Sequence, residues 1–128
     1  MALTFTDAIA AWSRAIDKTS STDFELMLDE SFEWHSTNSG RATSRADTLR
    51  WVRETELRIG NFTTLHNSST VICGTHEVYE PGKDDTIVMC VAQLSEDGSR
   101  LMNWTITRAN YYTNQDSPTA HMGLGFFL

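Results

Sequence analysis

The sequence predicts an α+β fold, with helices in the N-terminal half covering one face of an antiparallel sheet formed by the C-terminal half. In the first half hydrophobic residues recur at helical spacing, whereas from Phe62 onward they recur with a period of two. The clearest strands, residues 86–94 and 101–108, flank Asp97 and Gly98, an arrangement typical of a β-hairpin. The 128 residues are therefore expected to form a single domain, 1–128.

The first two helices are predicted from their capping residues. The first covers residues 5–18, with Thr6 as its N-terminal cap. The second begins at Thr22, where Glu25 three residues later completes a capping box. This second helix is short and is expected to end near Asp29 and Glu30.

A short strand and a third helix follow. Residues 31–35 are predicted to form the strand, which leads into a polar turn. Ser44 and Asp47 mark the start of the helix, which is expected to run to about Ile59. Gly60 would then end it in the left-handed conformation.

Four antiparallel strands complete the expected fold. They cover approximately residues 62–67, 70–80, 86–94 and 101–108. The turn residues 81–84, with the sequence Pro-Gly-Lys-Asp, separate the second of these strands from the third.

The composition excludes several classes of function. The formal net charge is −7 and the isoelectric point about 4.9, which argues against nucleic acid and anionic membrane surfaces as partners. No hydrophobic run approaches a membrane span, and the N-terminus does not resemble a signal peptide, so a cytoplasmic protein is expected. Cys73 and Cys90 are predicted to be free thiols within strands, and no spacing indicates a metal site or a cofactor.

Two stretches carry a resemblance to a known superfamily: DFELMLDESFEWHS, and GTHEVYEPGKDDTIVMCVAQLSEDGSRLMNWTITR. With the helix between them, they resemble the SnoaL-like polyketide cyclases and the ketosteroid-isomerase group of the nuclear transport factor 2-like superfamily, over about residues 5–112. The resemblance implies a cystatin-like α+β roll, in which a curved sheet and three N-terminal helices form a cone around an internal cavity. This superfamily includes isomerases, cyclases, dehydratases and non-catalytic modules, so the resemblance leaves the function open.

The isomerase pattern implies three functional positions, and this sequence departs from the pattern at each of them. The general base corresponds to about His35, whose ordinary pKa suits proton transfer. The oxyanion-hole tyrosine corresponds to about Trp12, and the protonated aspartate to about Cys90. Steroid isomerase activity is therefore not expected. If Phe32 and Trp34 form the inward pair of their strand, His35 would point outward.

His76 is a second candidate catalytic residue. It lies in the middle of a predicted strand, from which it could meet His35 across a pocket. Two such histidines would resemble the dehydratase branch of the superfamily, with Asp17 and Tyr79 as possible counterparts of its other site residues. The alternative is that His76 lies on the outer face of the sheet.

The remaining candidates are ligand-binding residues. Arg108 ends the hydrophobic face that contains Trp104, where it could bind a carboxylate or enolate oxygen at a cavity mouth. The alternative is that its side chain extends into water. Trp12, Trp34 and Trp104 either pack in the core or line a cavity suited to a flat, apolar ligand.

The sequence thus predicts a small-molecule enzyme of the cyclase, isomerase or dehydratase kind, which acts by cofactor-free acid–base chemistry on an apolar ligand. The alternative is a non-catalytic ligand-binding or assembly module of the same fold. Residues 86–94 are apolar on both faces, which favours a homodimer through the outer sheet face. The hydrophobic tail, residues 118–128, is expected to dock on its own subunit or on the partner.

Overall fold

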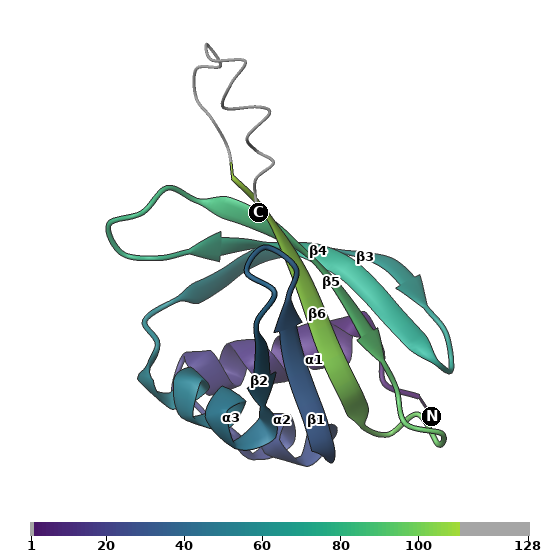
Figure 1. Ribbon diagram of the computed structural model, residues 1–128. Coiled ribbons are helices and arrows are strands. Elements are labelled where there is room, and N and C mark those ends of the chain that lie inside the picture. The colour runs from purple at the N-terminus through teal and green to yellow at the C-terminus, as the bar shows by residue number, and fades with distance from the viewer. Residues whose placement is uncertain (1, 111–128) are drawn as a thin grey trace.

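The computed structural model describes residues 2–110, which form a curved, unclosed sheet of six strands with three helices. Figure 1 shows α1 crossing one face of this sheet, with α2 and α3 beside it. The elements are α1 (Phe5–Ile16), α2 (Thr22–Met27), β1 (Leu28–Ser36), β2 (Ala42–Ser44), α3 (Arg45–Glu54), β3 (Arg58–Asn67), β4 (Val71–Tyr79), β5 (Thr86–Gln93) and β6 (Leu101–Asn110). This is the α+β architecture that the sequence predicts. The predicted docking of the tail lies outside the described residues.

The sheet has the strand order β2-β1-β6-β5-β4-β3. Strands β3 to β6 are antiparallel neighbours, as predicted. The first long strand, β1, pairs in parallel with the last, β6, so that Trp34 lies beside Trp104. This pairing makes β1 longer than the predicted 31–35 and ends α2 at Met27 rather than near Asp29. The edge strand β2 was not predicted.

The core lies between α1 and the inner face of the sheet. The ring of Phe5 stacks on Trp104 with a centroid distance of 5.9 Å, and Trp12 meets Trp104 edge-on at 5.2 Å. At Gly74 on β4, a Cβ atom would overlap the ring of Phe5. The absence of a side chain at this position therefore lets the start of α1 approach the sheet.

The observed N-terminal caps differ slightly from the predicted ones. Thr4, not Thr6, caps α1: its hydroxyl accepts from the backbone of Asp7 at 3.1 Å, and the Asp7 carboxylate accepts from the backbone of Thr4 at 3.0 Å. The predicted capping box of Thr22 and Glu25 is wrong: the N-cap residue of α2 is Ser21, whose side chain does not cap the helix backbone but donates from its hydroxyl to the Glu25 carboxylate at 2.7 Å. Both helices thus start close to their predicted positions.

The third helix begins after Ser44, as predicted, but it ends at Glu54 rather than near Ile59. Gly60 is therefore not a helix stop. It lies in β3, where the ring of Tyr79 occupies the space that a Cβ atom would need. The requirement for glycine at this position comes from a strand neighbour and not from a left-handed backbone.

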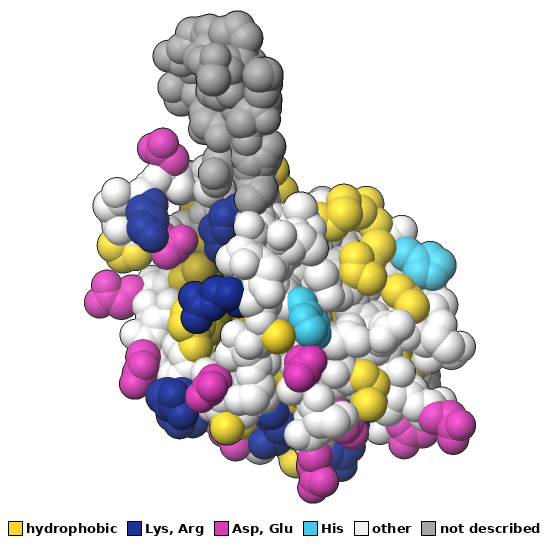
Figure 2. Space-filling model, in the orientation of Figure 1, with side chains coloured by type: hydrophobic (Ala, Val, Ile, Leu, Met, Phe, Trp, Pro, Cys, Tyr) yellow, Lys and Arg dark blue, Asp and Glu magenta, His cyan; other side chains and the backbone are white. Residues whose placement is uncertain are grey.

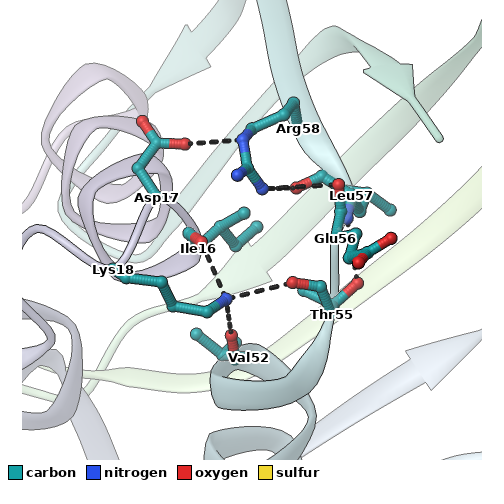
Figure 3. Close-up of polar contacts among 8 residues, drawn as sticks. All are labelled: Ile16, Asp17, Lys18, Val52, Thr55, Glu56, Leu57 and Arg58. Atoms are coloured by element: carbon teal, nitrogen blue, oxygen red, sulfur yellow. Dashed lines mark hydrogen bonds and ion pairs between the residues drawn. The ribbon is translucent and has the colours of Figure 1, made fainter. Parts of the chain in front are cut away.

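A lysine ties the ends of two helices together (Figure 3). Lys18 has a left-handed backbone, with φ of 64°, and its Nζ donates to the carbonyls of Ile16 at 2.9 Å, Val52 at 3.0 Å and Thr55 at 3.0 Å. These carbonyls lie at or beside the C-terminal ends of α1 and α3, where main-chain acceptors lack helical partners. One ammonium group therefore helps to fix where α3 ends.

None of the described helices has the length and hydrophobicity needed to cross a membrane.

Candidate ligand-binding cavity

A half-open cavity of about 990 Å³ lies between α3, the β1–β2 turn and the β4–β5 hairpin. Figure 2 shows it as a hollow on the left of the view, with hydrophobic side chains in its depth and Lys and Arg side chains beside it. Trp12, Leu57 and Ile106 are buried residues of its lining and form the floor. Its charged lining residues, which form the rim, are Arg41, Asp47, Arg50, Glu80, Lys83, Asp84 and Arg108.

Two tryptophans of the lining carry hydrogen-bond donors that have no acceptor among the residues that the structure describes. The Nε1 atoms of Trp12 and Trp34 are both buried without a partner in the described part of the chain. Trp34 also stacks on Trp51, at a centroid distance of 6.2 Å and an interplanar angle of 21°. Because an unpaired buried donor is costly, an acceptor atom of a bound molecule would stabilise this arrangement.

The rim contains a carboxylate shared between two cations. Glu80 lies 3.7 Å from Nη1 of Arg108 and 3.6 Å from Nζ of Lys83. Arg108 also donates to the hydroxyl of Thr86 at 2.9 Å. Arg41 forms no salt bridge within residues 2–110. The sequence signal for Arg41, Glu80 and Lys83 was only that they lie in or beside polar turns, so they were not identified as site residues.

His76 lies on the inner face of β4, not on the outer face considered as the alternative, and it is 3% exposed. Its Nδ1 is 3.0 Å from the carbonyl of Glu77. Since a carbonyl can only accept, Nδ1 carries the proton and Nε2 is left as an acceptor. Nε2 is buried with no partner among the described residues. Burial lowers the pKa of His76, and the positive charge of Arg108 lowers it further.

The ring of His76 meets Trp12 edge-on at 5.8 Å. His76 itself does not line the cavity, whereas Trp12 does. The histidine therefore lies behind a lining residue. A signal for its inward position is present in the sequence, because His76 has the same strand parity as the buried Ile72 and Val78.

His35 is not in the cavity. Phe32 is buried and Trp34 lines the cavity, so strand alternation places His35 on the opposite face of β1. Its Nε2 lies 3.2 Å from the carboxylate of Glu33, and 40% of its side chain is exposed. The structure consequently does not bring His35 and His76 together.

The other predicted site residues also lie outside the cavity lining. Tyr79 is exposed and donates to the carboxylate of Glu77. Cys90 is a free, fully buried thiol whose pKa is raised by burial, so it is neutral. Trp104 packs in the core, and Asp17 forms an exposed salt bridge rather than facing the cavity.

Trp12, Trp34 and Arg108 are thus the predicted residues that line the cavity. Within residues 2–110, no three His, Cys, Asp or Glu side chains are grouped so that they could hold a metal ion.

No protein-family model matches the sequence, and no curated protein matches it. Solved structures do resemble it. A ketosteroid isomerase candidate from Kribbella flavida is 14% identical, with a TM-score of 0.69, covering 91% of this chain and 86% of its own. An NTF2-like protein from Anabaena variabilis is 11% identical, with a TM-score of 0.63, and the match covers 83% of this chain and 87% of that protein. A candidate SnoaL-like polyketide cyclase from Shewanella denitrificans is 10% identical, with a TM-score of 0.55, and the match covers 80% of this chain and 88% of that protein.

The chain therefore has the nuclear transport factor 2-like fold, shared with proteins of the ketosteroid isomerase-like and SnoaL-like groups. At these levels of identity the likeness concerns the fold.

Proposed function

We propose that the protein binds a small, flat, largely apolar molecule in the cavity and converts it by cofactor-free acid–base chemistry of the isomerase, cyclase or dehydratase kind. The size of the cavity, about 990 Å³, supports the proposal because it is at the upper end of the range of small-molecule sites. Tryptophans in the lining offer flat surfaces on which a planar ligand can stack.

The observation that carries the proposal is the state of His76. Its hydrogen bond to the Glu77 carbonyl holds the tautomer in which Nε2 has a free lone pair, and the lowered pKa keeps that lone pair unprotonated near neutral pH. Nε2 would remove a proton from carbon beside a carbonyl group of the ligand. The indole N–H of Trp12 or Trp34 would donate to the oxygen on which negative charge develops.

Access to His76 depends on Trp12, because the indole contacts His76 and also lines the cavity. We infer that ligand binding turns this indole aside and thereby exposes Nε2 to the ligand.

The second candidate is a non-catalytic binding module. One observation favours it: the deep part of the lining, formed by Trp12, Leu57 and Ile106, contains no titratable side chain. A protein of this kind would bind the same class of ligand and release it unchanged.

Solvent-deuterium exchange distinguishes the two candidates. Planar cyclic ketones and enones would be incubated with the protein in D₂O, and incorporation at the carbon beside the carbonyl would be followed by NMR. For a ketone exchanged by the wild type, His76→Gln should slow exchange by roughly 10²–10⁴-fold. The matched control His35→Gln should exchange at the wild-type rate, because His35 faces away from the cavity.

Equal rates for His76→Gln and the wild type would exclude His76 as the base. Binding of these ketones without any exchange would instead favour the non-catalytic module.

We also propose that the protein is a homodimer through the outer face of the sheet. Ile87, Met89 and Val91 of β5 lie on that face, and Met89 and Val91 are 46% and 40% exposed. Figure 2 shows hydrophobic side chains gathered over the sheet at the upper right of the view. A second copy would cover side chains that the helices on the other face cannot reach.

A further inference from the structure

Positive charge is concentrated at the cavity in an otherwise acidic protein. Four of the ten Lys and Arg residues line the cavity, whereas three of the sixteen Asp and Glu residues within the described residues 2–110 do. Because a cleft with low-dielectric walls focuses the field of its charges, such a distribution raises the local concentration of anions. A cavity built for a wholly neutral ligand would not need this arrangement.

The position of Arg41 is fixed by the turn that carries it. Gly40 has a φ of 71°, and its N–H donates to the Ser36 carbonyl at 2.8 Å, which closes the β1–β2 turn. The turn is joined to β6 by Asn38, whose side chain accepts from the backbone N–H of Arg108 at 2.7 Å and donates to its carbonyl at 3.2 Å. Arg41 is thereby held at the rim on the turn that binds the backbone of Arg108.

This part of the rim has one positive charge in excess, because Arg41, Lys83 and Arg108 face two carboxylates, those of Glu80 and Asp84. Glu80 lies between Lys83 and Arg108, so one carboxylate faces two cations. Arg41 has no salt bridge to any residue that the structure describes. Guanidinium groups bind planar anions such as carboxylates through paired hydrogen bonds. Both arginines line the same cavity as the tryptophans, so a single ligand can reach both environments.

We propose that Arg41 and Arg108 form a subsite for an anionic group. The ligand would then be a planar, apolar acid whose rings lie on the floor of the cavity and whose anionic group lies at the rim. The inference rests on the proposed function, because it specifies the ligand of the same cavity. The indole N–H groups of the cavity lining would donate to an oxygen on the rings of this ligand, and the two guanidinium groups would bind the oxygens of its anionic group.

Two dyes that differ in one group test this subsite. 1-Anilinonaphthalene-8-sulfonate carries a sulfonate, and N-phenyl-1-naphthylamine has the same rings without it. Binding would be measured by fluorescence titration of the full chain at low ionic strength. The wild type should bind the anionic dye about tenfold more tightly or better than the neutral dye, since hydrogen bonds to charged groups are worth more than one tenfold step in affinity.

Variants locate the effect. Arg41→Gln and Arg108→Gln should each weaken binding of the anionic dye by about tenfold and leave the affinity for the neutral dye unchanged, which also verifies that the cavity is intact. Arg53→Gln is the matched control, because Arg53 is an exposed arginine of α3 that does not line the cavity. It should bind both dyes as the wild type does.

Equal affinities for the two dyes would overturn the anionic subsite while leaving the apolar cavity in place. A preference for the anionic dye that survives both cavity substitutions would also overturn it, since the sulfonate would then be bound elsewhere. If neither dye bound, the proposed function would be contradicted, and the subsite with it.

Discussion

At the scale of single residues, His76 combines deep burial with a nitrogen, Nε2, that has no partner within residues 2–110. Such groups are rare in folded proteins because each costs free energy, and they gather at functional sites. In His76 the unpaired atom is Nε2 of a neutral ring, because Nδ1 carries the proton and donates it to the Glu77 carbonyl. The same environment has a consequence for stability that can be measured without a substrate.

The free energy of unfolding should fall as the pH drops below about 6.5, the ordinary pKa of histidine. The pKa of His76 is lowered in the folded state, so between the two pKa values the unfolded chain binds the extra proton. Stability from the buried neutral ring is therefore fully present above pH 6.5 and is lost as the pH falls toward the folded-state pKa. The slope should approach at most about 1.4 kcal/mol per pH unit in urea titrations.

His76→Gln is the control, because glutamine does not titrate and should flatten the curve in this window. Asp97 acts at lower pH: hydrogen bonds from Ser99 lower its pKa to about 2, so its contribution is lost only as the pH falls below about 3.8. A wild-type curve that is flat between pH 6.5 and 5 would contradict the buried, neutral state of His76.

At the scale of secondary-structure elements, helix ends are set by contacts between segments distant in the sequence. Lys18 follows α1 and binds carbonyls at the end of α3. All three of its ammonium protons have main-chain acceptors, and a positive charge is favourable at helix C-termini. Local signals in the sequence could not indicate this stop.

Lys18→Met should lower the free energy of unfolding by about 1–3 kcal/mol, because it retains most of the side chain but leaves three carbonyls without their charged donor. The measurement is a urea titration. Lys83→Met is the comparison, since Lys83 forms one exposed ion pair and should cost about 0–1 kcal/mol. Equal effects of the two substitutions would show that the Lys18 contacts do not stabilise the helix ends.

At the scale of the whole molecule, strand β5 is central to the sheet and apolar on both faces. Its inner face is buried against the helices, whereas Met89 and Val91 remain exposed on the outer face. The proposed dimer would bury these side chains and leave the cavity, on the other side of the sheet, open to ligand.

The double substitution Met89→Glu and Val91→Glu should therefore convert a dimer into a monomer in sedimentation velocity at micromolar concentration, because carboxylates would be buried unpaired at the interface. Leu26→Glu serves as the control, since Leu26 is 67% exposed on α2 and lies away from this face. Wild-type protein that sediments as a monomer would refute the dimer.

The sequence by itself determined the fold class, the three helices, the four antiparallel strands and the inward position of Trp12. These features follow from periodicity and capping, which depend on residues close together in the chain. For Arg108 the sequence left open a cavity mouth or a side chain in water; in the structure Arg108 lines the cavity, and its role as a binding residue stays a prediction.

Only the tertiary structure decided which segments meet. The parallel pairing of β1 with β6, the early end of α3, and the joining of Arg41 and Arg108 at one rim each depend on residues far apart in sequence. The parity that His76 shares with Ile72 and Val78 indicates its inward position, but its contact with Trp12 depends on where α1 packs. Contacts of this kind are chosen by the free energy of burying one face against another, to which no local pattern corresponds.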